Sequence, residues 1–522
     1  MEEQIKILAK GLVENGLKYA FGVTGSGYSL MLITELENLG VQYYPVAHEA
    51  SAAIMAGTVS NITGNISVSI SIKGPGFANM LPGIVYNHFE NNPALSISEA
   101  FGSETPVYRK HKRLDHVGIF SRVVKKFSFS NQVERELPIL LDAAREEVPG
   151  PVHLELCEQH LKENGNYSFK SDNLPLLKQV TPEEVVRRLH KSERPILVIG
   201  SLVCRRNWKE KLQFLSIPIF TTASAKGVLD ESLMQSAGVY SGEGKELAPE
   251  AHLFAEADLI VGIGLRNTEV LSPKPFGKPT IIVDEINEGL TDGFDADVML
   301  TDASSKSVYD ILDTLSQKSW GGERTDFLRR NMENTLLKGL WLPSVCFRVL
   351  NDLDFPYTLV LDTGAFCTIG EHLWKAGPSR FFLGSSNGRY MGVALPSAVG
   401  AAICRKELPV FCVVGDGGMR MYPAEIKIAI EESLPMCFIL MTDGRYGSIV
   451  GVPQKSFRSI RATTVLLPSW WKAVEGMGCE SYTVNSVKAF EAALQGWNRS
   501  APLFIEINFD PTEYAEMTRQ LR

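Results

Sequence analysis

Short apolar runs alternate along the chain with longer stretches in which hydrophobic residues recur at helical spacing. In the first part of the sequence the apolar runs are 19–23, 41–47, 66–72, 94–100 and 151–157. Helices are expected between them at 3–16, 28–39, 49–60 and 77–89. Strands separated by helical stretches of this length are typical of a parallel sheet covered by helices on both faces.

The same alternation is repeated twice more. The second part has apolar runs at 195–199, 217–221, 259–263 and 280–283, and the third part has them at 358–361, 380–384, 409–414, 436–441 and 504–509. Residues 158–180 are polar and indicate a linker, and the charged, glycine-bearing stretch 314–335 indicates a second crossing between domains. A chain of 522 residues is too long for one core. We therefore predict an α/β protein of three domains, 1–165, 180–320 and 338–522, each a mostly parallel sheet flanked by helices.

Charge and cysteine usage narrow the class of protein. The net charge of −8 is spread without long runs, which disfavours nucleic acid and membrane surfaces as partners. The eight cysteines form no CxxC pair, which indicates free thiols in a cytoplasmic protein and no zinc site. The amphipathic N-terminus lacks the features of a signal peptide, and no apolar run is long enough to cross a membrane.

Two acidic loops follow two neighbouring apolar runs in the third domain. Strand 409–414 leads into Gly415-Asp416-Gly417-Gly418, a helix is expected at 422–432, and strand 436–441 leads into Thr442-Asp443-Gly444. Ligands of open α/β sheets bind at the carboxyl ends of strands. Two carboxylates there suit a hard divalent cation such as Mg²⁺, and a helix N-terminus beside them favours phosphate.

This stretch resembles the diphosphate-binding motif of thiamine diphosphate (ThDP) enzymes, in which GDG is followed at a set distance by an Asn pair. Here 24 positions, 418 to 441, intervene, and Thr442-Asp443 replaces the Asn pair, as in some acetolactate synthases. The resemblance implies Mg²⁺ held by Asp416, Asp443 and the main-chain carbonyl of Arg445. It also implies that the cofactor is lined by Gly364, Met391, Gly415, Asp416, Gly417, Gly418, Asp443, Tyr446, Gly447, Ser448 and Ile449. Met391 precedes Gly-Val-Ala-Leu-Pro, where the family places an apolar wedge between the cofactor rings, although a methionine can equally fill a core.

Glu49 follows the second apolar run, where the next helix starts. Alone, a glutamate there complements the helix dipole. However, YAFGVTGSG (19–27), PVAHEASAAIMAGTVSNITG (45–64) and ISIKGPGFANMLPGI (70–84) follow the order of the pyrimidine-binding domain in acetolactate synthase-like and benzoylformate decarboxylase-like enzymes. The resemblance implies that Glu49 binds the aminopyrimidine of ThDP and acts as its acid–base partner. The domain 1–165 would then bind the pyrimidine and 338–522 the diphosphate, with 180–320 between them.

The implied function is ThDP- and Mg²⁺-dependent decarboxylation of a 2-oxo acid, with transfer of the acyl-anion equivalent to a carbonyl acceptor. Three alternatives remain: a simple decarboxylase that releases an aldehyde, a flavin-linked oxidase of the same fold, and a non-catalytic nucleotide-binding relative. The glycines at 262–266 could belong to a nucleotide site or to a plain strand-end turn, and FAD is not predicted. The resemblance also implies a homodimer or homotetramer with sites at subunit interfaces. Candidate substrate residues are Thr24, Gly25, Ser26, Lys73, Lys112 and His116, although a basic loop such as 109–113 can also be merely solvated.

Overall fold

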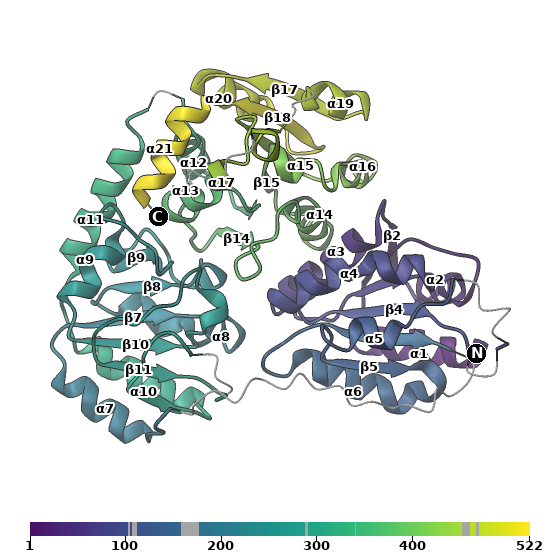
Figure 1. Ribbon diagram of the computed structural model, residues 1–522, viewed down its shortest axis with the longest axis horizontal. Coiled ribbons are helices and arrows are strands. Elements are labelled where there is room, and N and C mark those ends of the chain that lie inside the picture. The colour runs from purple at the N-terminus through teal and green to yellow at the C-terminus, as the bar shows by residue number, and fades with distance from the viewer. Residues whose placement is uncertain are drawn as a thin grey trace.

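The computed structural model describes residues 1–102, 105–106, 112–157, 177–287, 291–339, 341–450, 460–465 and 469–521. Within these residues the strands form three parallel sheets of six strands each, flanked by helices, which confirms the predicted fold class. Figure 1 shows the three corresponding lobes, with the first domain in purple and blue, the central domain in teal and the third domain in green and yellow.

The first sheet has the strand order β2-β1-β3-β4-β6-β5. Its strands are β1 (Tyr19–Gly22), β2 (Gln42–Pro45), β3 (Val68–Ser71), β4 (Leu95–Glu99), β5 (Lys126–Phe129) and β6 (Val152–Leu156). Its helices are α1 (Glu2–Glu14), α2 (Tyr28–Asn38), α3 (Glu49–Thr63), α4 (Pro75–Phe89), α5 (His116–Phe120) and α6 (Val133–Arg145). The central strands are buried along their whole length, as expected where helices cover both faces of a parallel sheet.

The central sheet has the strand order β12-β11-β10-β7-β8-β9, so the chain starts in the middle and reverses direction between β7 and β10. Its strands are β7 (Pro195–Ile199), β8 (Ile219–Thr221), β9 (Ser236–Val239), β10 (Leu259–Ile263), β11 (Thr280–Val283) and β12 (Val298–Leu300). Its helices are α7 (Pro182–Lys191), α8 (Leu202–Arg205), α9 (Pro249–Glu256), α10 (Ser305–Ser316) and α11 (Gly322–Leu336).

The third sheet has the strand order β14-β13-β15-β16-β18-β17. Its strands are β13 (Tyr357–Leu361), β14 (Arg380–Gly384), β15 (Val410–Gly415), β16 (Met436–Thr442), β17 (Glu480–Val484) and β18 (Leu503–Asn508). Its helices are α12 (Pro343–Asn351), α13 (Ala365–Leu373), α14 (Ala394–Cys404), α15 (Asp416–Met419), α16 (Ile426–Glu431), α17 (Gly447–Val450), α18 (Ile460–Thr463), α19 (Trp470–Gly476), α20 (Val487–Gly496) and α21 (Pro511–Leu521).

The structure corrects several predicted elements. Strands β5, β9, β12 and β17 were not predicted; all four are short and lie at sheet edges. The single helix expected at 422–432 is a 3₁₀ turn followed by the short helix α16, and the GDG segment itself begins helix α15. The stretch 314–335, expected as a crossing between domains, contains the end of α10 and most of α11. The predicted linker lies mostly outside the described residues, although Gln179 pairs with Met299 at the edge of the central sheet.

Helix α3 joins the first and third domains. Every residue from Glu49 to Ser60 is buried, so this helix has no solvent face. It packs against α4 of its own domain and α14 of the third domain. Small residues permit the close approach, since a Cβ at Gly400 of α14 would lie 3.2 Å from the backbone of Met55. The two domains therefore share one core, which contains Phe21 and Ala56 from the first and Leu395 and Val399 from the third.

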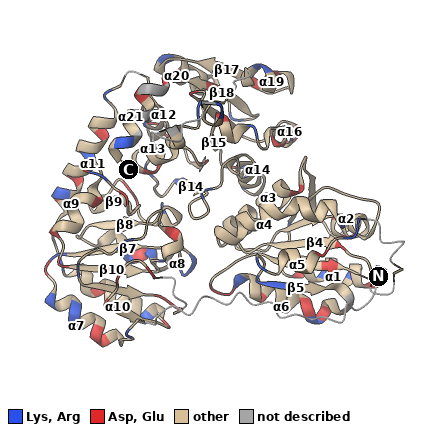
Figure 2. Ribbon diagram, viewed as in Figure 1, with Lys and Arg blue, Asp and Glu red and all other residues tan. Residues whose placement is uncertain are grey.

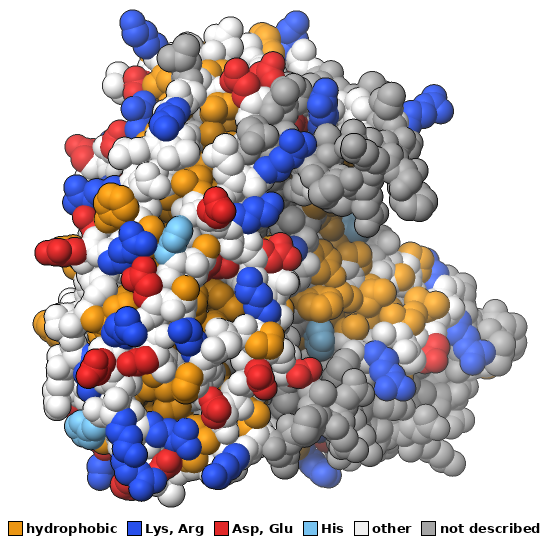
Figure 3. Space-filling view, turned by 60° about the vertical axis from the view of Figure 1, so that its left-hand side comes forward, with side chains coloured by type: hydrophobic (Ala, Val, Ile, Leu, Met, Phe, Trp, Pro, Cys, Tyr) orange, Lys and Arg blue, Asp and Glu red, His pale blue; other side chains and the backbone are white. Residues whose placement is uncertain are grey.

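The described surface carries both signs of charge in close mixture (Figure 2). The space-filling view shows the same mixture over most of one face, together with a broad apolar area beside the atoms that are not described (Figure 3). No helix in the described part of the chain is both long and apolar enough to cross a membrane. All eight cysteines are free thiols.

A buried ionic cluster joins the first domain to the central domain. The Arg266 guanidinium is fully buried, donates to both carboxylate oxygens of Asp284 at 2.9 and 2.8 Å, and donates to Glu147 Oε2 at 2.9 Å. Glu147, from the first domain, also accepts two hydrogen bonds from Arg205 at 2.7 and 2.9 Å. Burial acts to raise the pKa of Glu147, but the hydrogen bonds and charges of the two arginines outweigh it and hold this pKa below its usual value.

Replacing Arg266 by methionine should destabilise the protein strongly. The change removes the shared cation and leaves the buried carboxylates of Asp284 and Glu147 without their partner, which typically costs about 3–5 kcal/mol. Denaturant unfolding of Arg266→Met at neutral pH measures the loss. The matched control is Arg324→Met, whose side chain is 41% exposed and pairs with Glu256, and which should cost at most about 1 kcal/mol. Equal effects of the two substitutions would contradict this account.

Candidate functional site

Strands β15 and β16 bring Asp416 and Asp443 to the same edge of the third sheet. The two strands pair in parallel with Gly415 opposite Met441, so the loops that follow them leave the sheet side by side. The backbone N–H of Gly444 donates to Asp416 Oδ2 at 2.8 Å, which ties one loop to the other. The backbone N–H of Arg445 donates to Asp443 Oδ1 at 3.1 Å. The backbone pairing between 444–446 and 463–465 uses the carbonyl oxygens of Gly444 and Thr463 and not that of Arg445.

The pKa values of both carboxylates are raised above their usual values. Burial and the negative charge of Asp416 raise the pKa of Asp443 to about 6. Burial also raises the pKa of Asp416, although backbone N–H groups of Gly444 and Gly417 oppose the shift. Neither carboxylate forms an ion pair with a described residue, although the charges of Arg420 and Arg445 partly offset the two pKa shifts. No cluster of three or more metal-ligating side chains occurs in the described part of the chain. The pair therefore fits a hard cation that takes only a few ligands from protein.

Glycines beside this carboxylate pair allow close packing of the neighbouring side chains. A Cβ at Gly417 would lie 2.6 Å from Tyr446 Cε1 and 3.1 Å from Met391 Sδ, so no larger residue fits between these side chains. A Cβ at Gly447 would lie 3.4 Å from Asp443 Oδ2. The structure thus brings together Asp416, Asp443 and most of the predicted cofactor residues of the third domain. The exceptions are Ser448 and Ile449, which are exposed on α17.

The N-terminus of α13 faces the same region. Gly364 precedes the helix, and no side chain caps its first backbone N–H groups. The ring of Phe366 covers Gly415, where a Cβ would lie 2.9 Å from Phe366 Cε1, so the start of α13 lies against the end of β15. Uncapped N–H groups at a helix N-terminus favour an anion. A cation between the two aspartates and an anion at the N-terminus of α13 could therefore bind side by side.

The loop that carries Met391 is held by carboxylates on both sides. Glu90, from the end of α4 in the first domain, accepts hydrogen bonds from Ser385 Oγ at 2.9 Å and from the backbone N–H groups of Ser386, Asn387 and Gly388 at 3.0, 3.2 and 2.9 Å. Burial raises the pKa of Glu90, and these hydrogen bonds oppose the shift.

Asp362 holds the other end of the loop, directly after β13. Both of its oxygens accept from Gly392 N–H at 2.8 Å, and one accepts from Ala394 N–H at 3.3 Å. A Cβ at Gly418 would lie 2.1 Å from Asp362 Oδ2, so the carboxylate also abuts the GDG segment. Burial raises the pKa of Asp362 to about 7. Asp362 therefore links the Met391 loop to the candidate metal loop.

Arg389 adopts a left-handed backbone conformation in the same loop, with φ of 50°. Such a conformation is unfavourable for a residue with a long side chain and persists where other contacts hold it. The buried carboxylate of Glu371 on α13 supplies such a contact, since it accepts from Arg389 Nη1 at 2.5 Å. The loop before Met391 is thereby fixed to α13 as well as to Glu90.

Glu49 lies at the first turn of α3 and is 8% exposed. Asn79 Nδ2 donates to Glu49 Oε2 at 3.0 Å, while a Cβ at Gly76 would lie 3.2 Å from Oε1. The turn before Glu49 is held by Glu425 of the third domain, whose Oε2 accepts from Ala47 N–H at 3.4 Å. Among the described residues of one chain, no hydrogen bond or ion pair joins Glu49 to Asp416 or Asp443, so their meeting at one site stays a prediction.

The predicted substrate residues gather at the carboxyl edge of the first sheet. Thr24 and Ser26 are exposed, and a Cβ at Gly25 would lie 2.1 Å from the Ile72 side chain. Lys73 Nζ pairs with Glu99 Oε2 at 2.6 Å. The backbone of Lys112 lies against Gly74, where a Cβ would be 2.3 Å from the Lys112 carbonyl oxygen.

His116 is buried beneath this edge and both ring nitrogens have partners. Nε2 accepts from Gly74 N–H at 3.1 Å, so Nδ1 carries the proton that is shared with Glu155. The ring stacks on Phe77 with centroids 3.8 Å apart. This placement suits a residue that positions the Gly74 loop, which leads to Gly76 and Glu49, and the predicted contact with substrate is untested.

Protein carboxylates occupy the crevice at the direction change of the central sheet. Glu269 accepts from Ser201 N–H at 2.8 Å and from Thr222 Oγ1 at 2.8 Å, directly beside the ends of β7 and β8. Asp284 and Glu147 hold Arg266 next to it. In open α/β sheets this crevice is where nucleotide phosphates bind. Here the chain's own carboxylates lie in this crevice, and two of them are paired with Arg205 and Arg266.

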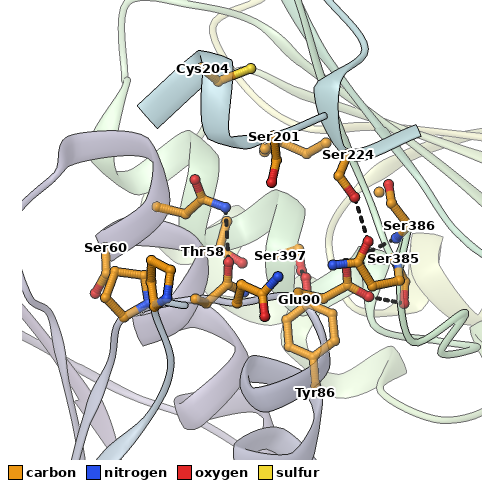
Figure 4. Close-up of a pocket in the computed structure, with 18 of the residues that line it drawn as sticks. Thr58, Ser60, Tyr86, Glu90, Ser201, Cys204, Ser224, Ser385, Ser386 and Ser397 are labelled. Atoms are coloured by element: carbon orange, nitrogen blue, oxygen red, sulfur yellow. Dashed lines mark hydrogen bonds between the residues drawn. The ribbon is translucent and has the colours of Figure 1, made fainter. Parts of the chain in front are cut away.

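A cavity of about 450 Å³ lies where the three domains meet (Figure 4). Tyr86 and Glu90 line it from the first domain, Ser201 and Ser224 from the central domain, and Ser385 and its neighbours from the third. Asp416 and Asp443 are not among the residues that line it. The cavity is thus a space distinct from the carboxylate pair, and it shares with that pair only the loop that Glu90 holds.

Sequence reasoning missed four residues that shape this region: Asn79, Glu90, Asp362 and Glu425. Asp362 could have been found, because it follows strand β13 as Asp416 follows β15. Asn79 lies within the family-like stretch 70–84 but was not singled out there, and Glu90 and Glu425 belong to no recognised motif. Their roles depend on partners in other elements or another domain, which the sequence pattern does not reveal.

Changing Glu90 to glutamine should loosen the Met391 loop. Glutamine keeps one acceptor oxygen but turns an NH₂ group toward backbone donors, and an unsatisfied buried group costs about 1–3 kcal/mol. We expect faster amide hydrogen exchange at 386–388 and a drop of that order in the free energy of unfolding. Glu134→Gln, on the exposed side of α6, serves as the control and should change stability by less than about 0.5 kcal/mol. Unchanged exchange at 386–388 would refute the role of Glu90.

Comparison with known proteins covers all three domains. The models of the thiamine pyrophosphate (ThDP) enzyme N-terminal TPP binding domain, central domain and C-terminal TPP binding domain match residues 4–116, 182–305 and 362–507. The probable acetolactate synthase large subunit of Methanococcus aeolicus is 23% identical over 98% of this chain and 92% of its own length. The acetolactate synthase of Bacillus subtilis (strain 168) is 23% identical over 97% and 92%, and the acetolactate synthase large subunit of Pyropia yezoensis is 25% identical over 94% and 88%. With the three domains matched in order, the chain belongs to the family of thiamine diphosphate-dependent enzymes.

Proposed function

We propose that this protein is a ThDP- and Mg²⁺-dependent enzyme that decarboxylates a 2-oxo acid and joins the remaining acyl unit to a carbonyl acceptor. The bond to the carboxylate carbon breaks and CO₂ leaves. A new carbon–carbon bond forms at the carbonyl carbon of the acceptor, and a proton is added to its oxygen, so no external oxidant or reductant is needed. The name of the relatives, acetolactate synthase, supports this reaction type.

The observation that carries the proposal is the uncompensated carboxylate pair beside an uncapped helix. The negative charge of Asp416 raises the pKa of Asp443, so a cation beside the pair would stabilise both carboxylates. The N-terminus of α13 favours an anion. A Mg²⁺–diphosphate group satisfies both requirements, because Mg²⁺ is commonly held by one or two carboxylates together with phosphate oxygens. Asp416, Asp443 and the carbonyl of Arg445 would hold the metal, and Gly415, Gly417, Gly418 and Gly447 would allow the close approach.

Glu49 supplies the proton-transfer group of the proposed site. ThDP, when bound, supplies an electron sink for the carbon that loses CO₂. Asn79 donates to one oxygen of Glu49, and no described residue donates to the other, so that oxygen can share a proton with a ring nitrogen. Met391, next to Gly417, offers a polarisable apolar surface for the cofactor rings. In this proposal Glu49 and the metal loop come from different subunits of a dimer or tetramer, and the apolar area in Figure 3 is of the kind that subunit contacts use.

The substrate side of the site is proposed to lie on the first domain. Thr24, Gly25, Ser26, Lys73 and Lys112 surround the Gly74 loop, and His116 fixes that loop from below. The Lys73 ammonium provides a positive charge for the substrate carboxylate, although Glu99 shares it.

The direct test is to incubate the protein loaded with Mg²⁺ and ThDP with a panel of 2-oxo acids, with and without aldehyde or keto acceptors, and to identify products by mass. Aldehydes alone would favour the simple decarboxylase, and no CO₂ from any acid would refute the proposal.

Replacing Glu49 by glutamine should abolish most catalysis while leaving cofactor affinity nearly unchanged. Removing a general acid–base group typically costs a factor of about 10² to 10⁴ in rate. We expect the exchange of the cofactor C2 proton with solvent, followed by NMR after acid quench, to slow by at least that factor. Glu14→Gln, on the exposed face of α1, is the control and should exchange at the wild-type rate. Wild-type exchange in the Glu49 variant would remove Glu49 from the chemistry.

Mg²⁺ affinity should rise with pH through the titration of Asp443. The folded apo protein has an Asp443 pKa of about 6, so below that pH the metal must displace a proton, and above it the carboxylate is already ionised. Calorimetric titration should show affinity falling by up to about tenfold per pH unit below about pH 6, with proton release, and levelling off near pH 7 and above. Asp443→Asn should bind more weakly, with a flatter pH dependence. An affinity that stays constant from about pH 5 to pH 8 would contradict the assignment.

A further inference from the structure

The C-terminal helix α21 lies against the wall of the proposed diphosphate site. It packs against α13 and α17, the two helices that start at Gly364 and Gly447. Lys245 of the central domain holds its far end: the Lys245 backbone N–H donates to Leu521 O at 3.1 Å and Nζ donates to Arg519 O at 3.2 Å. Both bonds go to carbonyl oxygens of the last helical turn, where a positive charge is also favourable. Figure 1 shows α21 in yellow, between α11 and α13.

Tyr514 of α21 lies in the buried cluster that also contains Ala365 and Phe366 from the first turn of α13. Its side chain is 4% exposed, and its hydroxyl has no hydrogen-bond partner of ordinary geometry in the described structure. Burial raises the pKa of this hydroxyl, the nearby Asp443, Cys367 and Asp416 raise it further, and the backbone N–H of Phe366 lowers it. The phenol is thus set between the carboxylate pair and the first turn of α13, the two features that define the proposed diphosphate position.

A buried hydroxyl without a partner is unfavourable, and native proteins rarely retain one unless something else satisfies it. The Phe366 N–H can only donate, so it leaves the O–H proton of Tyr514 without an acceptor. Once a cation neutralises Asp416 and Asp443, an oxygen of an anion bound at the N-terminus of α13 is an acceptor suited to this position. A phosphate oxygen meets this description and forms short, strong bonds with hydroxyl donors.

We infer that the Tyr514 hydroxyl donates a hydrogen bond to the diphosphate of the cofactor, so that the C-terminal helix completes the diphosphate site of its own chain. This inference rests on the proposed binding of Mg²⁺–ThDP but not on the proposed reaction. The central domain takes part through Lys245, which fixes the position of α21. The substrate residues lie on the first domain, which is why the diphosphate rather than the substrate is assigned to Tyr514.

The test compares Tyr514→Phe with the wild-type protein, using calorimetric titration with Mg²⁺–pyrophosphate and with Mg²⁺–ThDP. Losing a hydrogen bond to a charged group should weaken the binding of both ligands by about tenfold to a hundredfold. Binding of thiamine, which lacks the diphosphate, should not differ between the two proteins. The control is Tyr482→Phe, whose ring is 42% exposed and whose hydroxyl bonds Glu480 at the surface, and it should bind like the wild type.

A second measurement separates a ligand contact from a structural role. Removing an unpartnered buried hydroxyl should leave the melting temperature of the apo protein unchanged or raise it, whereas the stabilisation by Mg²⁺–pyrophosphate should shrink. Lys245→Met should weaken pyrophosphate binding in the same direction but less, because the backbone bond to Leu521 remains. Pyrophosphate affinity of Tyr514→Phe within about twofold of wild type, or a lower apo melting temperature with unchanged affinity, would overturn the inference. If the wild type binds Mg²⁺–ThDP but releases no CO₂ from any 2-oxo acid, the proposed reaction fails and the role of Tyr514 stands.

Discussion

A carboxylate that is buried away from water needs hydrogen-bond donors or a cation beside it. This requirement explains both the contacts between domains and the character of the candidate site. Glu90 satisfies it with N–H groups of a neighbouring domain, Asp362 with N–H groups of its own domain, and Glu147 with two arginines. Each of these is complete within the chain. Asp416 and Asp443 differ, because they are partly buried and form no ion pair within the described residues, and the charges of Arg420 and Arg445 do not cancel the upward pKa shifts. The negative charge of these two carboxylates marks the place where a bound ligand would have to supply positive charge.

The same carboxylates set the geometry around that place. Glu90 and Asp362 grip the two ends of the segment 385–394, which places Met391 beside Gly417. Glu425 fixes the turn that enters α3, so the position of Glu49 depends on the third domain. The functional side chains are therefore held by residues from other domains, which explains how a site built on loops can keep a fixed shape.

Much of this could be anticipated from the sequence, and the failures have a common cause. Interior strands such as β7, β10 and β16 are uniformly apolar, and their predicted positions match the structure closely. The four strands that were not predicted all lie at sheet edges, where one neighbour is missing and the pattern is weaker: β17 alternates between exposed and buried residues and β12 has three residues. The glycine-and-aspartate loops were visible because their spacing along the chain matches two adjacent strands. Glu90 and Asn79 were not, because their partners are close only in space.

Helix α3 has a consequence for how the domains can be separated. It is buried on all sides from Glu49 to Ser60 and lies between the first sheet and α14, so the first and third domains behave as one packed unit although the whole central domain intervenes in sequence. A fragment that ends after the first domain would expose one side of this helix to water and would be prone to aggregate. Folding must also bring together segments that are distant along the chain, which slows it and leaves the early part of the protein unprotected until synthesis is nearly complete.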